Sequence, residues 1–341
     1  MFSPRDLATI RQKISQSGQI LITTHRSPDA DAMGSSLGLK HLLEKHTGAK
    51  VIVMVPDSFP SFLDWMPGTQ QTVVFDKNTS EATMMLLSAD LIFCLDYNHP
   101  SRTASMEKSL REAGATKVML DHHQEPDNFV DYRWSDTNAS STCELIVAFM
   151  DAMQWQQTLD KNIATCLYTG IMTDTGSFRF SATTAHTHRI IARLMDTGIR
   201  QWEIHEAIFN QNTFEKLRLW GHAFLNKLEL IPEHKTAFIS VTEEELKLFH
   251  FAEGDLEGLV NYALSIKGMQ LGVLFSERAG KIRISFRSVG DFSVQQFAST
   301  YFNGGGHKNA SGGSSSLTMA ETILRFKTCL HTFLNENPPR D

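Results

Sequence analysis

The first half of the chain alternates short apolar runs with longer segments of helical character. The apolar runs are continuous rather than alternating with polar residues, which predicts strands that are buried on both faces, as in a parallel sheet. Helices between such strands imply right-handed crossovers and a layered α/β fold. Ser141 and Glu144 fit a capping box at the start of one of these helices. The predicted strands are 19–24, 50–55, 89–96 and 116–121, and the predicted helices are 32–46, 141–153, 160–173 and 184–195.

The last third of the chain has a different pattern. Segments 269–277 and 281–287 alternate apolar and polar residues on either side of Ala279-Gly280, which predicts a β-hairpin. A further strand at 235–241 and helices at 255–266, 293–302 and 318–334 accompany it. We therefore predict a mainly parallel sheet with helices on both faces over 1–195, a helical linker over 196–229, and a smaller α/β domain over 230–337, with a cleft between the two domains.

Composition places the chain among ordinary globular proteins. Hydrophobic residues make up 41% of its 341 residues and charged residues 21%. No apolar stretch is long enough for a membrane span, residues 1–15 lack the apolar core of a signal peptide, and the four cysteines form no CxxC pair. We expect a cytoplasmic protein that does not contact membranes. The net charge of −6 is unlike that of a protein that grips long nucleic acid, so any polyanion needs a small positive site, which metal ions can supply.

Polar side chains follow three of the predicted strands, at the point where each strand ends. The segment 25–31 follows the first strand, Asp96 ends a later one, and Asp121-His122-His123 ends the next. Because the carboxyl ends of parallel strands line one crevice, we expect these groups to converge. Asp174, in the sequence GIMTDTGSF, belongs to a helix-rich segment. The candidate metal ligands are His25, Asp29, Asp31, Asp96, His122 and Asp174.

Four carboxylates and two imidazoles at close range would repel one another or take up protons, and divalent cations resolve this conflict. The mixed oxygen and nitrogen donors suit Mn²⁺, and also Mg²⁺, Fe²⁺ or Zn²⁺. A carboxylate that bridges two ions is a common arrangement for phosphoryl transfer. Taken singly, an aspartate at a strand end is typical of a helix cap and a lone histidine is typical of a core. The joint placement of these residues is what favours a metal site.

The motifs HRSPDAD, the isolated LD at Asp96, DHH at 121–123 and TDTGSF resemble those of the DHH phosphoesterase superfamily. The segment GGGHKNASG at 304–312 is similar to the motif of the DHH-associated C-terminal domain. The short two-domain layout most resembles the NrnA-type subgroup of oligoribonucleases and pAp phosphatases. The resemblance implies a hydrolase that degrades short oligoribonucleotides to mononucleotides and dephosphorylates pAp. A cyclic or linear dinucleotide phosphodiesterase and a catalytically silent nucleotide-binding protein stay open as alternatives.

The resemblance also implies a role for each motif residue. One metal ion would be held by His25, Asp29 and Asp96, and a second by Asp31, Asp96, His122 and Asp174, so that Asp96 bridges the two ions. Asp121 would orient an imidazole, and His123 would face the scissile phosphate. We expect short RNA, dinucleotides or pAp as substrates, and a homodimer stays open.

Substrate contacts are predicted mainly in the last third. Gly304, Gly305 and Gly306 permit close backbone approach and an anion-binding nest to which His307 adds a donor, although a flexible linker would have the same composition. Arg283, Ser285 and Arg287 share one face of a strand. We predict Arg287 and Ser288 as substrate contacts, and Arg102, which follows Asp96 in the same loop, as a phosphate contact.

Overall fold

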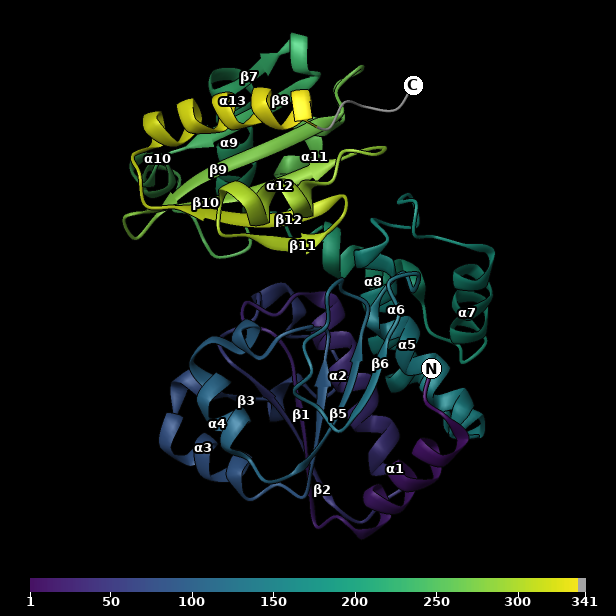
Figure 1. Ribbon diagram of the computed structural model, residues 1–341. Coiled ribbons are helices and arrows are strands. Elements are labelled where there is room, and N and C mark those ends of the chain that lie inside the picture. Colours follow the sequence, from purple (N-terminus) through teal and green to yellow (C-terminus); the bar gives the residue numbers. More distant parts are fainter. Residues whose placement is uncertain (337–341) are drawn as a thin grey trace. The chain divides into compact units, whose positions relative to one another are not determined.

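The computed structural model describes residues 1–336 and divides the chain into two units, Met1–Gln211 and a second that begins at Asn212 (Figure 1). The predicted linker is shared between them: helix α8 (Gln201–Phe209) belongs to the first unit and α9 (Phe214–His222) to the second. Among residues 1–336, no helix is long and apolar enough to cross a membrane.

The first unit is built on a sheet of six strands in the order β3-β2-β1-β4-β5-β6, and every neighbouring pair is parallel. The four predicted strands are confirmed, whereas the two edge strands were not predicted. The strands are β1 (Gln19–Thr23), β2 (Lys50–Val55), β3 (Val73–Val74), β4 (Leu91–Leu95), β5 (Thr116–Asp121) and β6 (Tyr132–Ser135).

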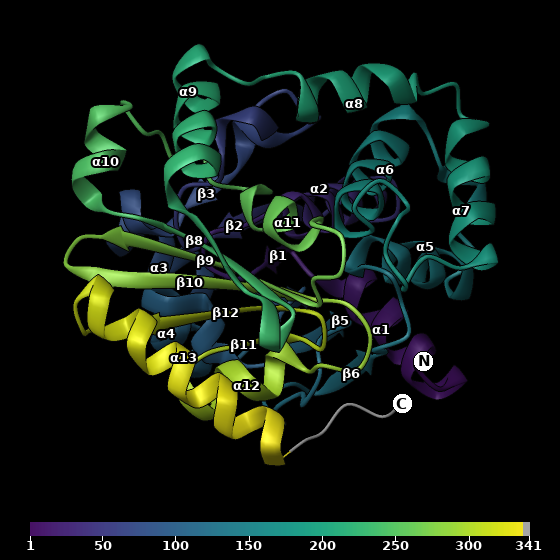
Figure 2. The ribbon, with the colours of Figure 1, turned by 90° about the horizontal axis from the view of Figure 1, so that it is seen from above.

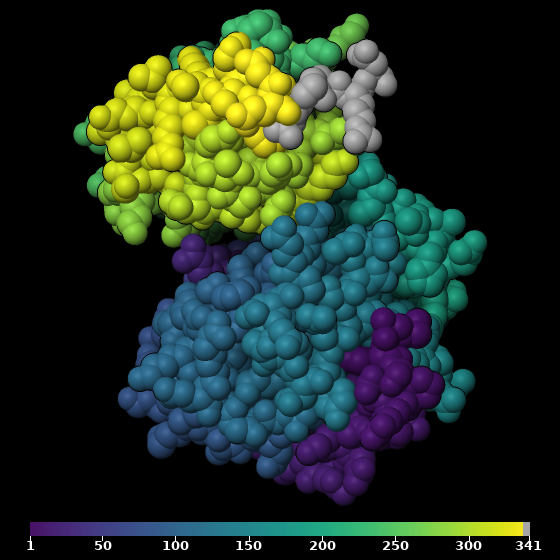
Figure 3. All heavy atoms as spheres, in the orientation of Figure 1, coloured from purple at the N-terminus to yellow at the C-terminus, as the bar shows by residue number. Residues whose placement is uncertain are grey.

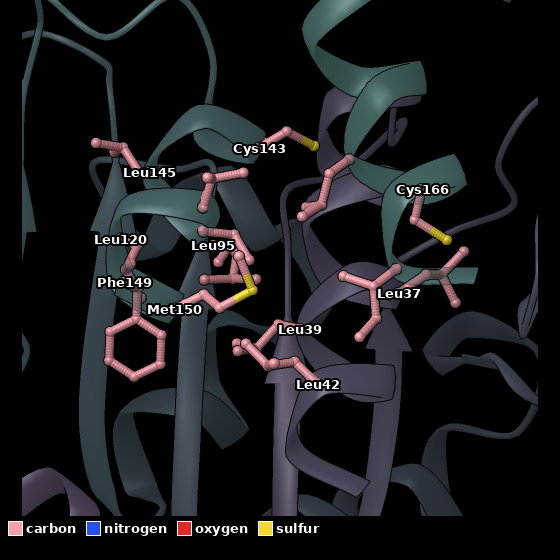
Figure 4. Close-up of a cluster of buried hydrophobic side chains, with 14 of the residues drawn as sticks. Leu37, Leu39, Leu42, Leu95, Leu120, Cys143, Leu145, Phe149, Met150 and Cys166 are labelled. Atoms are coloured by element: carbon pink, nitrogen blue, oxygen red, sulfur yellow. The ribbon is translucent and has the colours of Figure 1, made fainter. Parts of the chain in front are cut away.

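Helices cover both faces of this sheet because successive strand residues are apolar on both sides. Ile20 and Ile22 of β1 join one core cluster, and Leu21 between them joins the other. The larger cluster lies against α1 (Pro4–Gln16), α2 (Ala30–Glu44), α5 (Thr142–Ala152), α6 (Lys161–Asp174) and α7 (Ala185–Met195), and the smaller against α3 (Thr79–Leu87) and α4 (Glu107–Glu112). Figure 4 shows part of the larger cluster, where leucines of α2 meet Phe149 and Met150 of α5. Figure 3 shows α1, in purple, on the surface of the first unit.

Strand order reverses at β1. The chain passes from β1 to β2 and β3 on one side, and later continues with β4, β5 and β6 on the other side. The loops that follow β1 and β4 therefore begin side by side at the carboxyl ends of adjacent strands and lead in opposite directions. In open α/β sheets this switch point is where ligands bind.

Two glycines allow α2 and α6 to approach each other closely. A Cβ atom at Gly34 would lie 2.5 Å from the carbonyl oxygen of Cys166. A Cβ atom at Gly170 would lie 2.8 Å from Oδ1 of Asp31. The packing of these two helices thus brings the end of α6 toward the start of α2.

The second unit contains a mixed sheet in the order β11-β12-β10-β9-β8-β7, in which only β8 and β9 are parallel. The predicted hairpin of β9 and β10 is confirmed. The Ser- and Gly-rich segment after the glycine motif is not a flexible linker: it forms β12 and pairs with β10. The strands are β7 (Leu228–Ile231), β8 (Thr236–Val241), β9 (Leu271–Arg278), β10 (Lys281–Ser288), β11 (Gly305–His307) and β12 (Ala310–Ser315).

Helices cover this second sheet on both faces as well, as Figure 2 shows. One core cluster joins the sheet to α12 (Val294–Tyr301) and α13 (Met319–Glu336). The other joins it to α9, α10 (Glu243–Leu248) and α11 (Leu259–Leu264). The helix predicted over 255–266 is shorter in the structure, because its first residues form turns. The helix α11 begins after Gly258, which has a left-handed φ of 82°.

Candidate metal centre

Asp96 lies at the centre of a cluster of carboxylates and imidazoles at the switch point of the first sheet. It directly follows β4, its residue surface is 2% exposed, and its backbone has a left-handed φ of 63°. Its Oδ2 lies 3.3 Å from Nε2 of His25, and its Oδ1 lies 3.5 Å from Nε2 of His122. A left-handed aspartate is uncommon, and such residues often occur where a site dictates the direction of a side chain.

The loop after β1 contributes His25, Asp29 and Asp31. Asp29 is the N-cap of α2: its Oδ1 accepts hydrogen bonds from the amides of Asp31 and Ala32 at 3.0 Å each. Its Oδ2 points the other way and lies 3.9 Å from Nε2 of His25. Asp29 therefore acts as a helix cap through Oδ1, while its Oδ2 belongs to the cluster.

The DHH motif at the end of β5 places two imidazoles in different roles. Nδ1 of His122 lies 3.2 Å from the carbonyl oxygen of Ala139, so Nδ1 donates and Nε2 carries the lone pair that faces the carboxylates. Nδ1 of His123 lies 2.7 Å from Oδ1 of Asp121. Asp121 thus contacts His123, and its Oδ2 is buried without a hydrogen-bond partner among the described residues.

Asp174 reaches the cluster from the last residue of α6. Its Oδ2 lies 3.4 Å from Nε2 of His122. The chain then reverses through three successive residues with left-handed backbone, Gly176, Ser177 and Phe178, whose φ values are 56°, 61° and 66°. The sharp turn ends α6 at the site, so the fourth motif joins the three at the strand ends.

The pKa values of the cluster show how strongly its charges interact. Burial, followed by repulsion from Asp96 and Asp174, raises the pKa of Asp31 well above its ordinary value. Burial also opposes ionisation of Asp96, yet its contacts with His122 and His25 hold its pKa well below the usual range. Burial would lower the pKa of both histidines, but the same contacts raise them, that of His122 most. The cluster therefore requires positive charge, which protons or divalent cations can supply.

Two groups of candidate donor atoms share Asp96. Ligand atoms of His25, Asp29 and Asp96 lie within 4.8 Å of one another, and so do those of Asp31, Asp96 and His122. Carboxylate oxygens and imidazole nitrogens are suitable donors for divalent transition metals. These groups can hold metal ions: the first has the three residues that the resemblance implies for one ion, and the second has those implied for the other ion except Asp174.

Sequence reasoning missed the first turn of α5. The amides of Thr142 and Cys143 donate to Oδ2 and Oδ1 of Asp31, at 2.7 and 2.9 Å. The Thr142 hydroxyl donates to Oδ1 of Asp96 at 2.8 Å. The signal in the sequence was the helix start at Ser141, which does cap α5 through its contact with the Glu144 amide. The capping box is only half formed, because Glu144 instead accepts from Ser140 and Thr187.

The residues predicted to contact substrate lie in different parts of the structure. Arg102 lies near the cluster: its carbonyl oxygen accepts from the Arg26 amide at 2.8 Å, and its charge acts on His25 against the upward shift of that pKa. Arg287 lies with Arg283 on the polar face of β10, as predicted. Ser288 points to the opposite face, is buried, and donates to the carbonyl oxygen of Phe292, so the structure does not bring Ser288 together with Arg287.

The glycine motif forms a strand and a close contact. Gly304 is followed by β11, an edge strand in which Gly305, Gly306 and His307 pair with β12. A Cβ atom at Gly304 would lie 2.9 Å from that of Ala298, and Gly306 has a φ of 142°. Gly304 thus packs closely within the second unit and residues 305–307 form an edge strand, while anion binding by these glycines stays a prediction.

Family models match both units of the chain. The model for the DHH family, N-terminal domain, matches residues 19–171, and the model for the DHHA1 domain matches residues 239–334. The chain is 30% identical over 319 residues to a probable bifunctional oligoribonuclease and PAP phosphatase NrnA of Streptococcus mutans, covering 93% of this chain and 96% of that one. The chain belongs to the DHH family.

Two other relatives extend this picture. The crystal structure of an exopolyphosphatase-related protein from Bacteroides fragilis is 36% identical, covers 97% of both chains and superposes with a TM-score of 0.92. A cyclic-di-AMP phosphodiesterase PdeA of Listeria monocytogenes is 27% identical and covers 92% of this chain, but the match spans only 47% of that protein.

Proposed function

We propose that this protein is a metal-dependent phosphoesterase that degrades short oligoribonucleotides to mononucleotides and removes phosphate from pAp. The observation that carries the proposal is the pair of donor groups that share Asp96 at the switch point of the parallel sheet. The match along nearly the whole length of an oligoribonuclease and PAP phosphatase supports the same substrate class.

Two divalent ions, with Mn²⁺ the best fit to the donors, would be held by His25, Asp29 and Asp96 and by Asp31, Asp96, His122 and Asp174. When bound, such a pair supplies an activated water and stabilises charge on the attacking and departing oxygens of a phosphate. His25, Asp31, Asp96 and His122 are buried, and Asp31 and Asp96 accept hydrogen bonds from the first turn of α5. Little reorganisation is needed, which favours tight and specific binding.

His123 is the residue best suited to handle a proton on the substrate. Its Nδ1 is anchored on Asp121 at 2.7 Å, which orients the ring and directs Nε2 away from that carboxylate. An imidazole oriented in this way can donate a hydrogen bond or a proton at Nε2 to a phosphate or departing oxygen. Arg102, with a positive charge felt at His25, is suited to neutralise a terminal phosphate.

The preference for short substrates follows from charge. The chain has a net charge of −6, and a long RNA would need a continuous basic track. A few donors such as Arg287 and His307 in the second unit can contact only a few phosphates. We therefore expect affinity for substrates of about two to five nucleotides and little gain from added length.

A ladder of 5′-labelled RNAs from dimer to 24-mer, incubated with Mn²⁺ and metal-stripped protein, tests this proposal. We expect kcat/KM to be highest for the shortest RNAs, and inorganic phosphate to be released from pAp. Faster cleavage of the 24-mer than of the dimer would refute the substrate class. No turnover of any substrate with Mn²⁺, Mg²⁺ or Zn²⁺ would instead favour a silent nucleotide-binding protein.

A dinucleotide phosphodiesterase is the second candidate, because the chain also matches a cyclic-di-AMP phosphodiesterase. Both functions use the same metal centre, so the ladder should include cyclic and linear di-AMP. A kcat/KM for cyclic di-AMP above that for diadenylate RNA would reverse our assignment.

A further inference from the structure

The first turn of α5 contacts two of the carboxylates proposed as metal ligands. Three donors from two successive residues are involved: the Thr142 amide, the Thr142 hydroxyl and the Cys143 amide. Thr142 is fully buried, and Asp31 and Asp96 are each 2% exposed, so water does not compete for these contacts.

The two amides act on Asp31 as a pair. One donates to each carboxylate oxygen, at 2.7 and 2.9 Å, which fixes the plane of the carboxylate as well as its position. They are the first amides of an eleven-residue helix, where the backbone carries partial positive charge. This turn therefore holds the Asp31 carboxylate in place through both of its oxygens.

The hydroxyl acts on Asp96. It donates to Oδ1 at 2.8 Å, the same oxygen that lies 3.5 Å from Nε2 of His122. Oδ2 instead lies toward His25. This donor restrains rotation of the carboxylate and favours the arrangement in which Oδ1 faces His122 and Oδ2 faces His25. Because Asp96 belongs to both donor groups, one hydroxyl influences both.

We propose that Thr142 is a positioning residue of the metal centre, which holds Asp31 through its amide and Asp96 through its hydroxyl in the geometry that two cations require. The inference rests on the proposed function, since it concerns the same ions. It adds a residue that lies outside the DHH motifs and forms no part of the six predicted ligands.

Three substitutions separate the donors of Thr142. Thr142→Ser keeps both the hydroxyl and the amide. Thr142→Val keeps the shape and the amide but loses the hydroxyl. Thr142→Pro loses both, at the first position of a helix, where proline is tolerated best, and after Ser141, whose extended backbone suits a following proline.

The primary measurement is calorimetric titration of the metal-stripped full chain with Mn²⁺. We expect Thr142→Ser to bind within about threefold of wild type, Thr142→Val about 10-fold more weakly, and Thr142→Pro about 100-fold more weakly, the range seen for partners of metal ligands. At saturating Mn²⁺, kcat on diadenylate RNA should fall in Thr142→Val while KM changes by less than about threefold.

Thr322→Val is the matched control. Thr322 is also fully buried and its hydroxyl also donates to a side-chain oxygen, that of Ser315 at 2.9 Å, but it lies in the second unit. This variant should lose stability and keep wild-type affinity for Mn²⁺. If Thr142→Pro does not fold, as judged by circular dichroism, the valine and serine variants decide the question.

The outcomes are distinguishable from failure of the proposed function. A wild-type protein that binds no Mn²⁺ would refute the metal centre itself. If Thr142→Val binds Mn²⁺ as tightly as wild type, the role of the hydroxyl is refuted. Weaker binding by Thr142→Ser together with wild-type binding by Thr142→Val would show that shape rather than hydrogen bonding matters.

Discussion

The two units present their candidate residues in opposite ways. In the first unit, His25, Asp31, Asp96 and His122 are at most 5% exposed and contact one another or the backbone. In the second, His307 lies on an edge strand and Arg287 on the polar face of β10, where only alternate residues are buried. The first arrangement is buried and fixed by contacts within the unit, whereas the second is more exposed.

This difference separates two tasks. A metal centre needs donors fixed within a fraction of an ångström, and burial with a full set of hydrogen bonds provides this. Contacts to a phosphate chain need exposed donors that tolerate several substrates. Substitutions in the first unit should therefore change metal binding and turnover together, while those in the second should change KM alone.

The largest effect is expected for Asp96→Asn. Asparagine keeps the size of the side chain and tolerates the left-handed backbone, but it lacks the charge that both donor groups share. We expect kcat on diadenylate RNA to fall by at least about a thousandfold, with Mn²⁺ binding weakened in parallel.

Asp90→Asn is the matched control at the opposite end of the same strand. The Asp90 carboxylate accepts hydrogen bonds from the amides of Gly18 and Gln19, far from the cluster along β4. It should lose some stability and keep its activity. Equal loss of activity in both variants would mean that Asp96 acts through the sheet rather than on metal ions.

A smaller effect is expected for Gly170→Ala, which tests whether rigidity of the first unit matters. Alanine favours helix, yet its Cβ would lie 2.8 Å from Oδ1 and 3.0 Å from the Cα of Asp31, so α2 and α6 must separate. We expect the free energy of unfolding to fall by about 1–3 kcal/mol and affinity for Mn²⁺ to fall as Asp31 moves.

Gly114→Ala provides the comparison for this effect, because no atom lies within 4 Å of the added Cβ. Urea unfolding and Mn²⁺ titration should leave this control unchanged. If Gly170→Ala bound Mn²⁺ normally, the site would be more plastic than the contacts of Asp31 indicate.

How much of each unit the sequence predicts depends on whether an element is defined by its own residues or by the strands that pair with it. The central strands β1, β2, β4 and β5 are continuous apolar runs, and their pattern is local. The strand β12 has the sequence ASGGSS, which has no strand propensity, and forms because β10 and β11 pair with it on either side. Edge strands β3 and β6 are too short for a clear pattern.

The candidate site divides in the same way. The side chains at the ends of β1, β4 and β5 could be predicted to converge, because strand ends in a parallel sheet share one edge. The contact of Thr142 with Asp96 joins residues 46 positions apart and depends on how α5 packs. Ser288 points away from Arg287 because successive residues of a strand face opposite sides of the sheet. The prediction of both residues as substrate contacts did not take this alternation into account.

In the second unit, His307→Ala should have a moderate effect confined to substrate. Loss of one donor to phosphate should raise KM for diadenylate RNA by roughly 10-fold, equivalent to about 1.4 kcal/mol, and leave kcat and Mn²⁺ affinity near wild type. His331→Ala, at an exposed position of α13, is the control. Loss of Mn²⁺ binding in His307→Ala would contradict the separation of tasks between the units.

The smallest effect concerns a polar network of the second unit away from the glycine motif. Burial would raise the pKa of Glu245, but hydrogen bonds from the Thr242 amide, His222 and Lys227 lower it to about 2. Because the folded pKa lies below the unfolded value near 4.5, Glu245 stabilises the fold above pH 4.5, and this contribution is lost as pH falls toward 2. We expect Glu245→Gln to lower the free energy of unfolding by about 1–3 kcal/mol at pH 7 and hardly at all near pH 2. Calorimetry of the full chain across this range, with Glu244→Gln on the exposed side of the same turn as control, measures the difference. A pH-independent loss would mean that the glutamate acts through packing. We expect turnover at pH 7 to be unchanged, because Glu245 is not among the predicted substrate contacts of this unit.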